Sequence, residues 1–283
     1  MGDPSTSESA RRPPAESYFV AGAISQYIGA AVAVNLFNEL PPATVALLRV
    51  ASAATVVLVV RRPWRRRWSV TDLGLAAGFG IFLAAMNTSI YYAWDELPLG
   101  NAVAIEFMGP IAVAAVSGRS LRSLLSLAVA AAGVVTLAGV EAEGTLRGVA
   151  FALLAGGCWA GYIVLGHRVA SAGSNVDGLG VGMAVGTLAI APLGVDGLGT
   201  AVSSPWLLGL AVSTGILSNV IPYGLDQTVM RRISRTRFAF LQALLPVTAT
   251  VVGLIALAQT PSARELMGIS LVVVAIIARR NSD

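Results

Sequence analysis

Long apolar runs recur along this chain from about residue 18 almost to its end, and this pattern constrains the fold more than any other feature. Each run is about 20 residues long and is bounded by glycine, proline or charge, a length that spans the ~30 Å hydrocarbon core of a bilayer as an α-helix. Since 55% of the residues are hydrophobic and only 12% are charged, no room is left for a sizeable soluble domain. We therefore predict an all-α integral membrane protein.

Counting runs of roughly 17 to 25 apolar residues predicts ten transmembrane helices. Their approximate ranges are 18–37, 41–60, 71–93, 97–117, 120–140, 146–166, 178–195, 204–226, 234–258 and 262–279. The preceding residues 1–17 are polar and rich in serine and proline, which predicts a disordered tail.

Arginine is distributed unevenly between alternate connections of these helices. The set of connections that includes both termini holds sixteen arginines, whereas the opposite set holds only Arg147 and Arg264. Positively charged short loops are retained on the cytoplasmic side of a membrane. We therefore expect both termini to be cytoplasmic.

Short patterns repeat in the same order in the two halves of the chain. Asn87–Tyr91 (NTSIY) in the third span corresponds to Asn219–Tyr223 (NVIPY) in the eighth. Glu106–Pro110 (EFMGP) in the fourth span corresponds to Gln242–Pro246 (QALLP) in the ninth. This order predicts an internal repeat of five helices.

The two repeats would be residues 18–140 and 146–279. Because five is odd, equivalent helices run in opposite directions, an arrangement that transporters use for alternating access with a site near the bilayer midplane. Proline removes a backbone hydrogen bond, and a helix break in a transporter exposes carbonyls to the cavity, although membrane helices also tolerate proline without a function. The predicted helix breaks are Pro110, Pro222 and Pro246.

Glu106 lies in the middle of the otherwise uncharged stretch Leu97–Ser117. A charge at the centre of a bilayer costs at least ~2.5 to 3.5 kcal/mol, so such residues usually face an interior cavity and a partner. Arg49 lies eight residues into the apolar run that starts at Pro41, and Glu106 lies nine residues into its own run. At ~1.5 Å per residue both groups would be roughly 12 to 14 Å deep, near the midplane.

Other polar residues within the spans can supply hydrogen bonds to the same cavity, although some would only bridge helices. The candidates are Asn87, Tyr91, Asn219, Tyr223 and Gln242, with Gln26 and Asn101 as further members.

Four segments carry a resemblance to a known family. They are Met86–Val113 (MNTSIYYAWDELPLGNAVAIEFMGPIAV), Gly157–Arg168 (GCWAGYIVLGHR), Ile216–Tyr223 (ILSNVIPY) and Arg235–Phe238 (RTRF). With these segments the chain resembles the EamA-type carriers of the drug/metabolite transporter superfamily, and within them the inner-membrane threonine and homoserine exporters. The resemblance extends over essentially all ten predicted spans.

The resemblance implies a ten-helix carrier in the bacterial inner membrane that moves small amino acids or related metabolites outward, driven by the proton gradient. It places Glu106 and Pro110 in the family's fourth-span motif and Arg49 in its second-span arginine position. The ninth span departs from the family, because Leu245 and Gln259 stand where relatives commonly have acidic residues. These departures leave the substrate and the coupling open.

A zwitterionic amino acid needs an acceptor for its ammonium and a donor for its carboxylate, since neither enters an apolar cavity unpaired. Arginine grips carboxylates with two parallel hydrogen bonds, and Glu106 can accept the ammonium group or a proton. One hypothesis is that Glu106 alternates between substrate, proton and Arg49. The alternative is a permanent Arg49–Glu106 ion pair that only locks helices together.

Three functions are weighed: a proton-coupled exporter of threonine- or homoserine-like amino acids, an efflux carrier for another metabolite or drug-like compound, and a non-transporting scaffold. No HExxH, GxSxG, P-loop or acidic metal-ligand motif is present, so neither an enzyme nor a metal or other cofactor is expected. The expected partners are a small-molecule substrate, protons and membrane lipids, but not nucleic acid. The sequence is also compatible with a homodimer.

Overall fold

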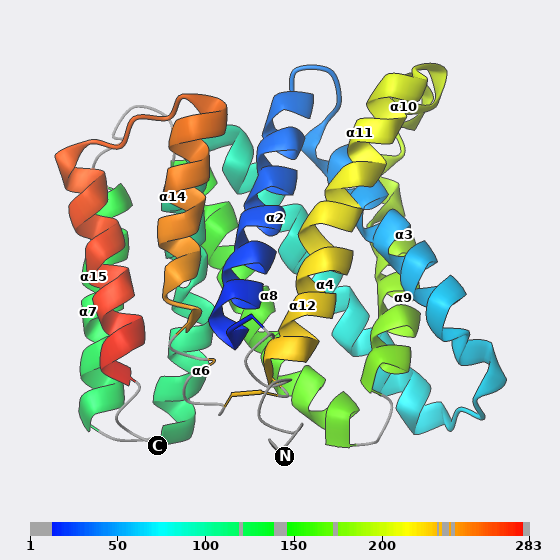
Figure 1. Ribbon diagram of the computed structural model, residues 1–283, viewed down its shortest axis with the longest axis horizontal. Helices are drawn as coiled ribbons and strands as arrows, with labels where there is room; N and C mark the ends of the chain where they lie inside the picture. Colours follow the sequence, from blue (N-terminus) through cyan, green and yellow to red (C-terminus); the bar gives the residue numbers. More distant parts are fainter. Residues whose placement is uncertain are drawn as a thin grey trace, which may run out of the picture.

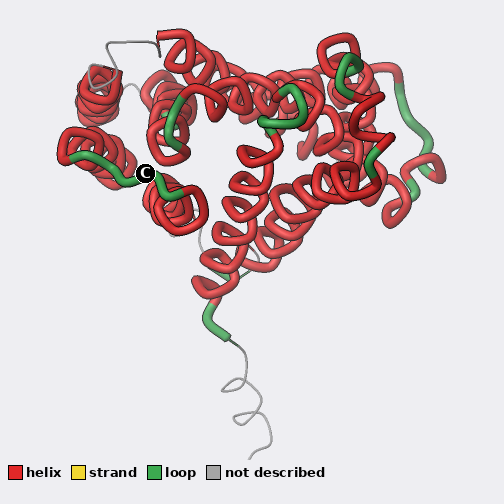
Figure 2. The backbone as a smooth tube through the Cα atoms, turned by 90° about the horizontal axis from the view of Figure 1, so that it is seen from above, coloured by secondary structure: helices red, strands yellow, loops and turns green. Residues whose placement is uncertain are grey.

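The computed structural model describes residues 13–118, 121–138, 146–171, 175–230, 232–233, 238 and 241–279. Within these ranges all regular secondary structure is helical, and short loops connect the helices (Figures 1 and 2). This agrees with the predicted all-α class.

The described part of each predicted span overlaps one helix or consecutive helices. The elements are α2 (Ala15–Leu36), α3 (Pro42–Arg61), η2 (Pro63–Arg65), α4 (Val70–Glu96), α5 (Leu99–Glu106), α6 (Met108–Gly118), α7 (Leu121–Ala138), α8 (Leu146–Ser171), α9 (Asn175–Gly194), α10 (Leu198–Ser203), α11 (Pro205–Gly215), η3 (Ile216–Val220), α12 (Ile221–Met230), α14 (Leu244–Leu257) and α15 (Ala263–Arg279). Because α2 begins at Ala15, the helix takes in the last residues of the predicted tail, whose residues 1–12 lie outside the described ranges.

Two spans predicted as single helices are interrupted. The fourth is divided at Phe107 into α5 and α6, and the eighth contains the π-helical segment η3 between α11 and α12. Pro110 and Pro222 have no N–H to donate to the carbonyls of Glu106 and Ser218, four residues earlier. The interruption therefore lies before each proline rather than at it.

The ninth span differs at its start. Residues 234–237 and 239–240 of this predicted helix lie outside the described ranges, and α14 begins at Leu244 after a turn at Gln242 and Ala243. Pro246 likewise has no N–H for the carbonyl of Gln242. The spacing of four residues between Gln242 and Pro246 is the spacing between Glu106 and Pro110.

Six helical segments of the described chain are long and apolar enough to cross a membrane. They are Ala15–Leu36, Pro42–Arg61, Val70–Glu96, Leu146–Gly166, Val176–Gly194 and Pro205–Leu225. The shorter apolar helices are Leu99–Val113, Leu124–Leu137 and Leu244–Leu257. The chain is therefore a multi-pass membrane protein.

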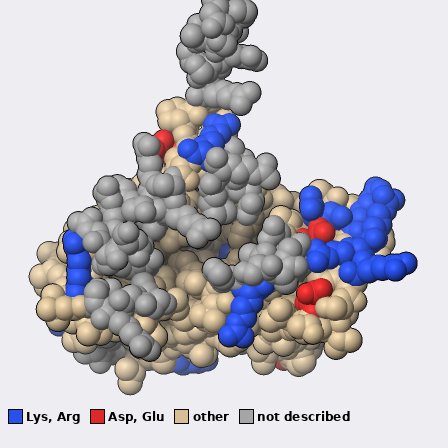
Figure 3. Space-filling view, turned by 90° about the horizontal axis from the view of Figure 1, so that it is seen from below, with Lys and Arg blue, Asp and Glu red and all other residues tan. Residues whose placement is uncertain are grey.

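The start of α2 and the end of α15 lie on the same side of the molecule, here called the termini side (Figure 1). Two contacts join connections on this side: Arg61 pairs with Asp177 at 3.1 Å, and Arg122 donates to the Ala278 carbonyl at 2.9 Å. Seen from this side, basic side chains gather at one edge of the molecule, where the arginine-rich 61–67 segment connects α3 to α4 (Figure 3).

Connections at the other helix ends meet on the opposite side. Glu96 pairs with Arg147 at 3.3 Å, and the amide N of Leu99 donates to Gln259 Oε1 at 2.9 Å. The end of α4, the starts of α5 and α8 and the residues after α14 are therefore neighbours there.

Glycine allows two pairs of helices to approach closely. A Cβ at Gly80 on α4 would overlap the carbonyl of Gly182 on α9, and one at Gly109 on α6 would overlap the carbonyl of Gly156 on α8. Small residues at helix interfaces are typical of membrane proteins. These contacts fix the helices that carry the candidate site residues.

Candidate functional site

Arg49 and Asn219 form the centre of the candidate site. Arg49, on α3, is buried with 6% of its surface exposed, and its Nε and Nη2 atoms donate to Asn219 Oδ1 at 3.3 and 3.0 Å. Its guanidinium carbon lies over the ring of Tyr91, 5.2 Å from the centroid. Three of the predicted residues, from α3, α4 and η3, are thus in direct contact.

Several buried polar atoms around this contact have no hydrogen-bond partner among the described residues. They are Arg49 Nη1, Asn219 Nδ2, Tyr91 Oη and Asn87 Oδ1. The Nδ2 atom of Asn87 donates to the Leu83 carbonyl at 2.7 Å, so the backbone of α4 holds that amide in place. Since buried polar groups are nearly always paired, this set of two donors, one acceptor and one hydroxyl is suited to a polar ligand.

Glu106 ends α5 at the interruption of the fourth span and is buried, with 8% of its surface exposed. Among the described residues none forms an ion pair or hydrogen bond with its carboxylate, so the permanent Arg49–Glu106 ion pair considered above is not present. Arg49 is nevertheless close enough to act on Glu106 electrostatically. The two ionisable groups therefore share one buried region without direct contact.

The main chain at Glu106 is also held in an unusual setting. Pro110 cannot donate to the Glu106 carbonyl, and Gly156 of α8 packs against that oxygen so closely that a Cβ there would lie 2.6 Å away. The absence of a side chain at Gly156 lets α8 pack on the interruption. This contact fixes the position from which the Glu106 side chain projects.

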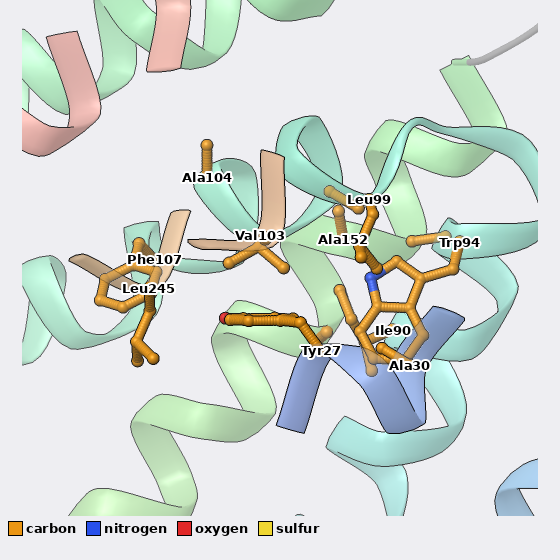
Figure 4. Close-up of a cluster of buried hydrophobic side chains, with 14 of the residues drawn as sticks. Tyr27, Ala30, Ile90, Trp94, Leu99, Val103, Ala104, Phe107, Ala152 and Leu245 are labelled. Carbon is orange, nitrogen blue, oxygen red and sulfur yellow. The ribbon is translucent and has the colours of Figure 1, made fainter. Parts of the chain in front are cut away.

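Tyr27 of α2 belongs to the same region, although the sequence reasoning did not select it. Its side chain is 2% exposed and lies within electrostatic range of both Glu106 and Arg49. Figure 4 shows its ring below Val103, with the hydroxyl directed toward Phe107 and Leu245. The available signal was its position beside Gln26, in the middle of an apolar span.

The remaining predicted residues lie at other places in the fold. Tyr223 lines a neighbouring cavity, and Gln242 is half-buried in the turn before α14, where no hydrogen bond joins it to Arg49 or Glu106 in the described chain. Pro110, Pro222 and Pro246 are buried.

Asn101 bridges two helices, the alternative considered above for the polar residues within the spans. Its Nδ2 atom donates to Glu265 Oε1 at 2.5 Å, and Glu265 Oε2 also accepts from the Ser262 amide at 2.6 Å. Asn101 therefore links α5 to the start of α15, at the opposite side of the molecule.

Two cavities lie on either side of the Arg49 region. One of about 230 Å³ lies between α3, α9 and the η3–α12 segment, with Asn219 in its wall and Arg61 at the termini side. The other, of about 570 Å³, lies at the opposite side and is lined by residues that include Asn35, Asp95 and Gln259.

Aromatic side chains separate Arg49 from the second cavity. The ring of Tyr91 packs against Phe37 and Trp94 at centroid distances of 5.7 and 5.0 Å, and Phe37 and Trp94 line that cavity. We call Phe37, Tyr91 and Trp94 the aromatic barrier.

Comparison with known proteins places this arrangement in a family. The EamA-like transporter family matches residues 146–278. The threonine/homoserine exporter RhtA of Escherichia coli strain K12 is 31% identical over 250 residues, which cover 87% of this chain and 84% of that protein. The chain belongs to the EamA-like transporter family. RhtA of Salmonella typhimurium strain LT2 is 30% identical over the same coverage.

The EamA-like fold is also found in a solved structure. A crystal structure covering 93% of this chain and 97% of its own aligns with a TM-score of 0.56 at 19% identity, which shows a shared fold. As an EamA-like transporter, the protein is a membrane carrier and not an enzyme.

The two positions at which this EamA-like transporter departs from the pattern of the family that it resembles lie in different surroundings. Leu245, in place of an acidic residue, is buried in the apolar cluster with Phe107 and Val103 (Figure 4). Gln259, in place of the other, accepts the Leu99 amide hydrogen and so stabilises the start of α5.

Proposed function

We propose that this protein exports small amino acids across the bacterial cytoplasmic membrane in exchange for protons. The observation that carries the proposal is a pair of buried donors, Arg49 Nη1 and Asn219 Nδ2, that have no hydrogen-bond partner among the described residues. The relatives of this chain are named threonine/homoserine exporters. Two such donors suit the two oxygens of a carboxylate. Charge assistance from the arginine makes these hydrogen bonds stronger than neutral ones.

Glu106 is the proposed acceptor for the ammonium group and for the coupling proton. It is buried, without a direct partner in the described chain, and within electrostatic range of Arg49. Substrate and proton would occupy the carboxylate in turn, because a buried negative charge without a counter-charge is costly. Asn87 Oδ1 and the Tyr91 hydroxyl complete the proposed substrate shell.

The proposed topology is ten transmembrane helices in two inverted repeats, residues 18–140 and 146–279, with both termini cytoplasmic. Support comes from the matching interruptions before Pro110 and Pro246 and from the arginine-rich connections on the termini side. In inverted-repeat carriers, broken helices at the repeat interface form the site near the midplane.

The proposed cycle alternates access between the two cavities. In this structure the cavity on the termini side reaches Asn219, whereas the aromatic barrier lies between Arg49 and the opposite cavity. We assign this arrangement to the state that loads substrate from the cytoplasm. Export then requires the aromatic barrier to open.

Everted membrane vesicles test the proposal, since their lumen corresponds to the cell exterior. Labelled threonine, homoserine and leucine should accumulate in the lumen when it is acidic, and accumulation should fall when the pH gradient is dissipated. Arg49→Gln should raise the substrate concentration needed for half-saturation roughly 10- to 100-fold, which corresponds to the loss of one charged hydrogen bond.

Glu106→Gln should abolish the part of accumulation that depends on the gradient. Glu39→Gln is the matched control, because Glu39 is exposed in the loop after α2, and it should transport as the wild type does. Full proton-dependent accumulation by Glu106→Gln would exclude the coupling role.

A further inference from the structure

The cavity on the termini side has almost purely hydrocarbon walls. It is lined by Ala53 and Val57 of α3, Leu179 and Met183 of α9, and Val220 of η3. Ala53 and Met183 are fully buried. The wall also includes Arg61, Asn219 and Tyr223, but its exposed surface is almost entirely apolar. A hydroxyl or a charge placed beside this surface therefore finds few hydrogen-bond partners.

This apolar space is adjacent to the proposed carboxylate site. Asn219 is part of the cavity wall, and the same residue accepts two hydrogen bonds from Arg49. A molecule whose carboxylate lies at Arg49 and Asn219 therefore has an apolar space beside it.

We propose that this cavity receives the side chain of the transported amino acid, and that the preferred substrates are aliphatic amino acids of the valine, leucine and isoleucine type. The inference rests on the proposed function, because it takes Arg49 and Asn219 as the carboxylate anchor. It goes beyond that function by assigning side-chain selectivity to Ala53, Val57, Leu179, Met183 and Val220.

The size of the cavity fits this class of side chain. An engineered protein cavity of ~150 Å³ with apolar walls binds benzene, so a cavity of about 230 Å³ holds the three or four carbons of a branched aliphatic side chain. Each buried methylene strengthens binding about fourfold. Leucine should therefore bind roughly 50-fold more tightly than alanine.

Hydroxylated analogues should bind less well. Some analogues have the same shape as the substrate but carry a hydroxyl in place of a methyl group. A hydrophobic pocket discriminates against such an analogue at most about 100-fold. Valine should consequently be preferred over threonine by roughly 10- to 100-fold, even though the relatives are named threonine/homoserine exporters.

Competition in everted vesicles containing the full-length protein tests this assignment. Unlabelled valine, isoleucine, alanine, threonine and homoserine should inhibit uptake of labelled leucine, with valine and isoleucine effective at the lowest concentrations. Val57→Phe narrows the cavity and should raise the half-saturation concentration of leucine about tenfold or more. The half-saturation concentration of alanine should change by less than about twofold.

Val57→Thr keeps the shape of the side chain and should shift the preference between valine and threonine toward threonine. Val59→Thr and Val59→Phe are the matched controls, because Val59 is on the same helix with 59% of its surface exposed and is not part of the cavity wall. Both controls should retain the wild-type order of substrates.

The outcomes separate the two proposals. Threonine or homoserine competing better than valine would overturn the assignment of the cavity but leave amino-acid export standing. If Val57→Phe lowered the transport of all amino acids equally, the assignment would also be overturned. Such a result would indicate that the cavity holds something other than the substrate side chain, such as a lipid acyl chain. If no amino acid is accumulated by the wild type, the proposed function itself fails.

Discussion

Replacing Gly80 by alanine should separate two helices that the site depends on. An alanine Cβ at this position would overlap the carbonyl of Gly182 and lie 2.5 Å from its Cα. Carbon atoms in good contact are about 3.5 to 4.0 Å apart, so α4 and α9 must move apart by more than about 1 Å. A gap of that size forfeits roughly half of the dispersion energy of the atoms concerned.

The expected loss of stability for Gly80→Ala is ~3 kcal/mol, the upper range for overpacking a close interface. At roughly 2 to 4 °C per kcal/mol for a protein of this size, Tm in detergent should fall by roughly 6 to 12 °C. Heating followed by fluorescence-detected size-exclusion chromatography measures this change.

Gly74→Ala is the matched control on the same helix. A Cβ there meets nothing within 4 Å, and alanine favours the helical backbone over glycine by ~1 kcal/mol, so Tm should stay the same or rise. If Gly80→Ala unfolded within 2 °C or so of the wild type, the close approach of α4 and α9 would not be a tight contact in the membrane protein, and the reasoning would be wrong.

Three further predictions concern the site. Pro110→Ala restores a donor for the carbonyl of Glu106, and everted vesicles should show slower transport without a fall in Tm; unchanged transport would argue against a role for the interruption. Asn219→Leu leaves the Arg49 guanidinium buried without an acceptor, a loss of roughly 3 to 5 kcal/mol that should lower Tm by at least 6 °C and abolish accumulation. Phe37→Ala thins the aromatic barrier, so vesicles preloaded with substrate should leak faster than wild-type vesicles; an unaltered leak would count against that barrier.

The positions of the helices could be predicted well because the length of an apolar run is set by the bilayer. The predicted range 41–60 became Pro42–Arg61, and 120–140 became Leu121–Ala138. The interruptions could not be located in the same way. A proline indicates which hydrogen bond is lost, but whether the helix bends, breaks or widens into a π-segment depends on neighbours such as Gly156, which packs against Glu106.

The candidate site shows the same limit. Depth in the membrane could be estimated by counting residues, and it led to Glu106 as the partner of Arg49. The structure instead pairs Arg49 with Asn219, because depth is only one coordinate and the direction of a side chain around its helix decides contact. Tyr27 was not predicted because a tyrosine in an apolar span is usually part of the core.

The interruptions explain why the candidate residues gather where they do. Glu106 ends α5, Asn219 lies in the π-helical η3, and Gln242 lies in the turn before α14. A proline follows each within four residues, so each interruption loses one regular hydrogen bond between residues four apart. At Gln242 the Leu245 amide donates to the carbonyl instead, at 3.0 Å, and such local adjustments are how membrane helices tolerate proline. Glu106 and Gln242 occupy related positions in the two halves of the chain, but only Glu106 has an ionisable side chain. Of these two positions, only that of Glu106 can therefore hold a coupling proton. The proposed exchange should then use one proton per amino acid at this pair of positions.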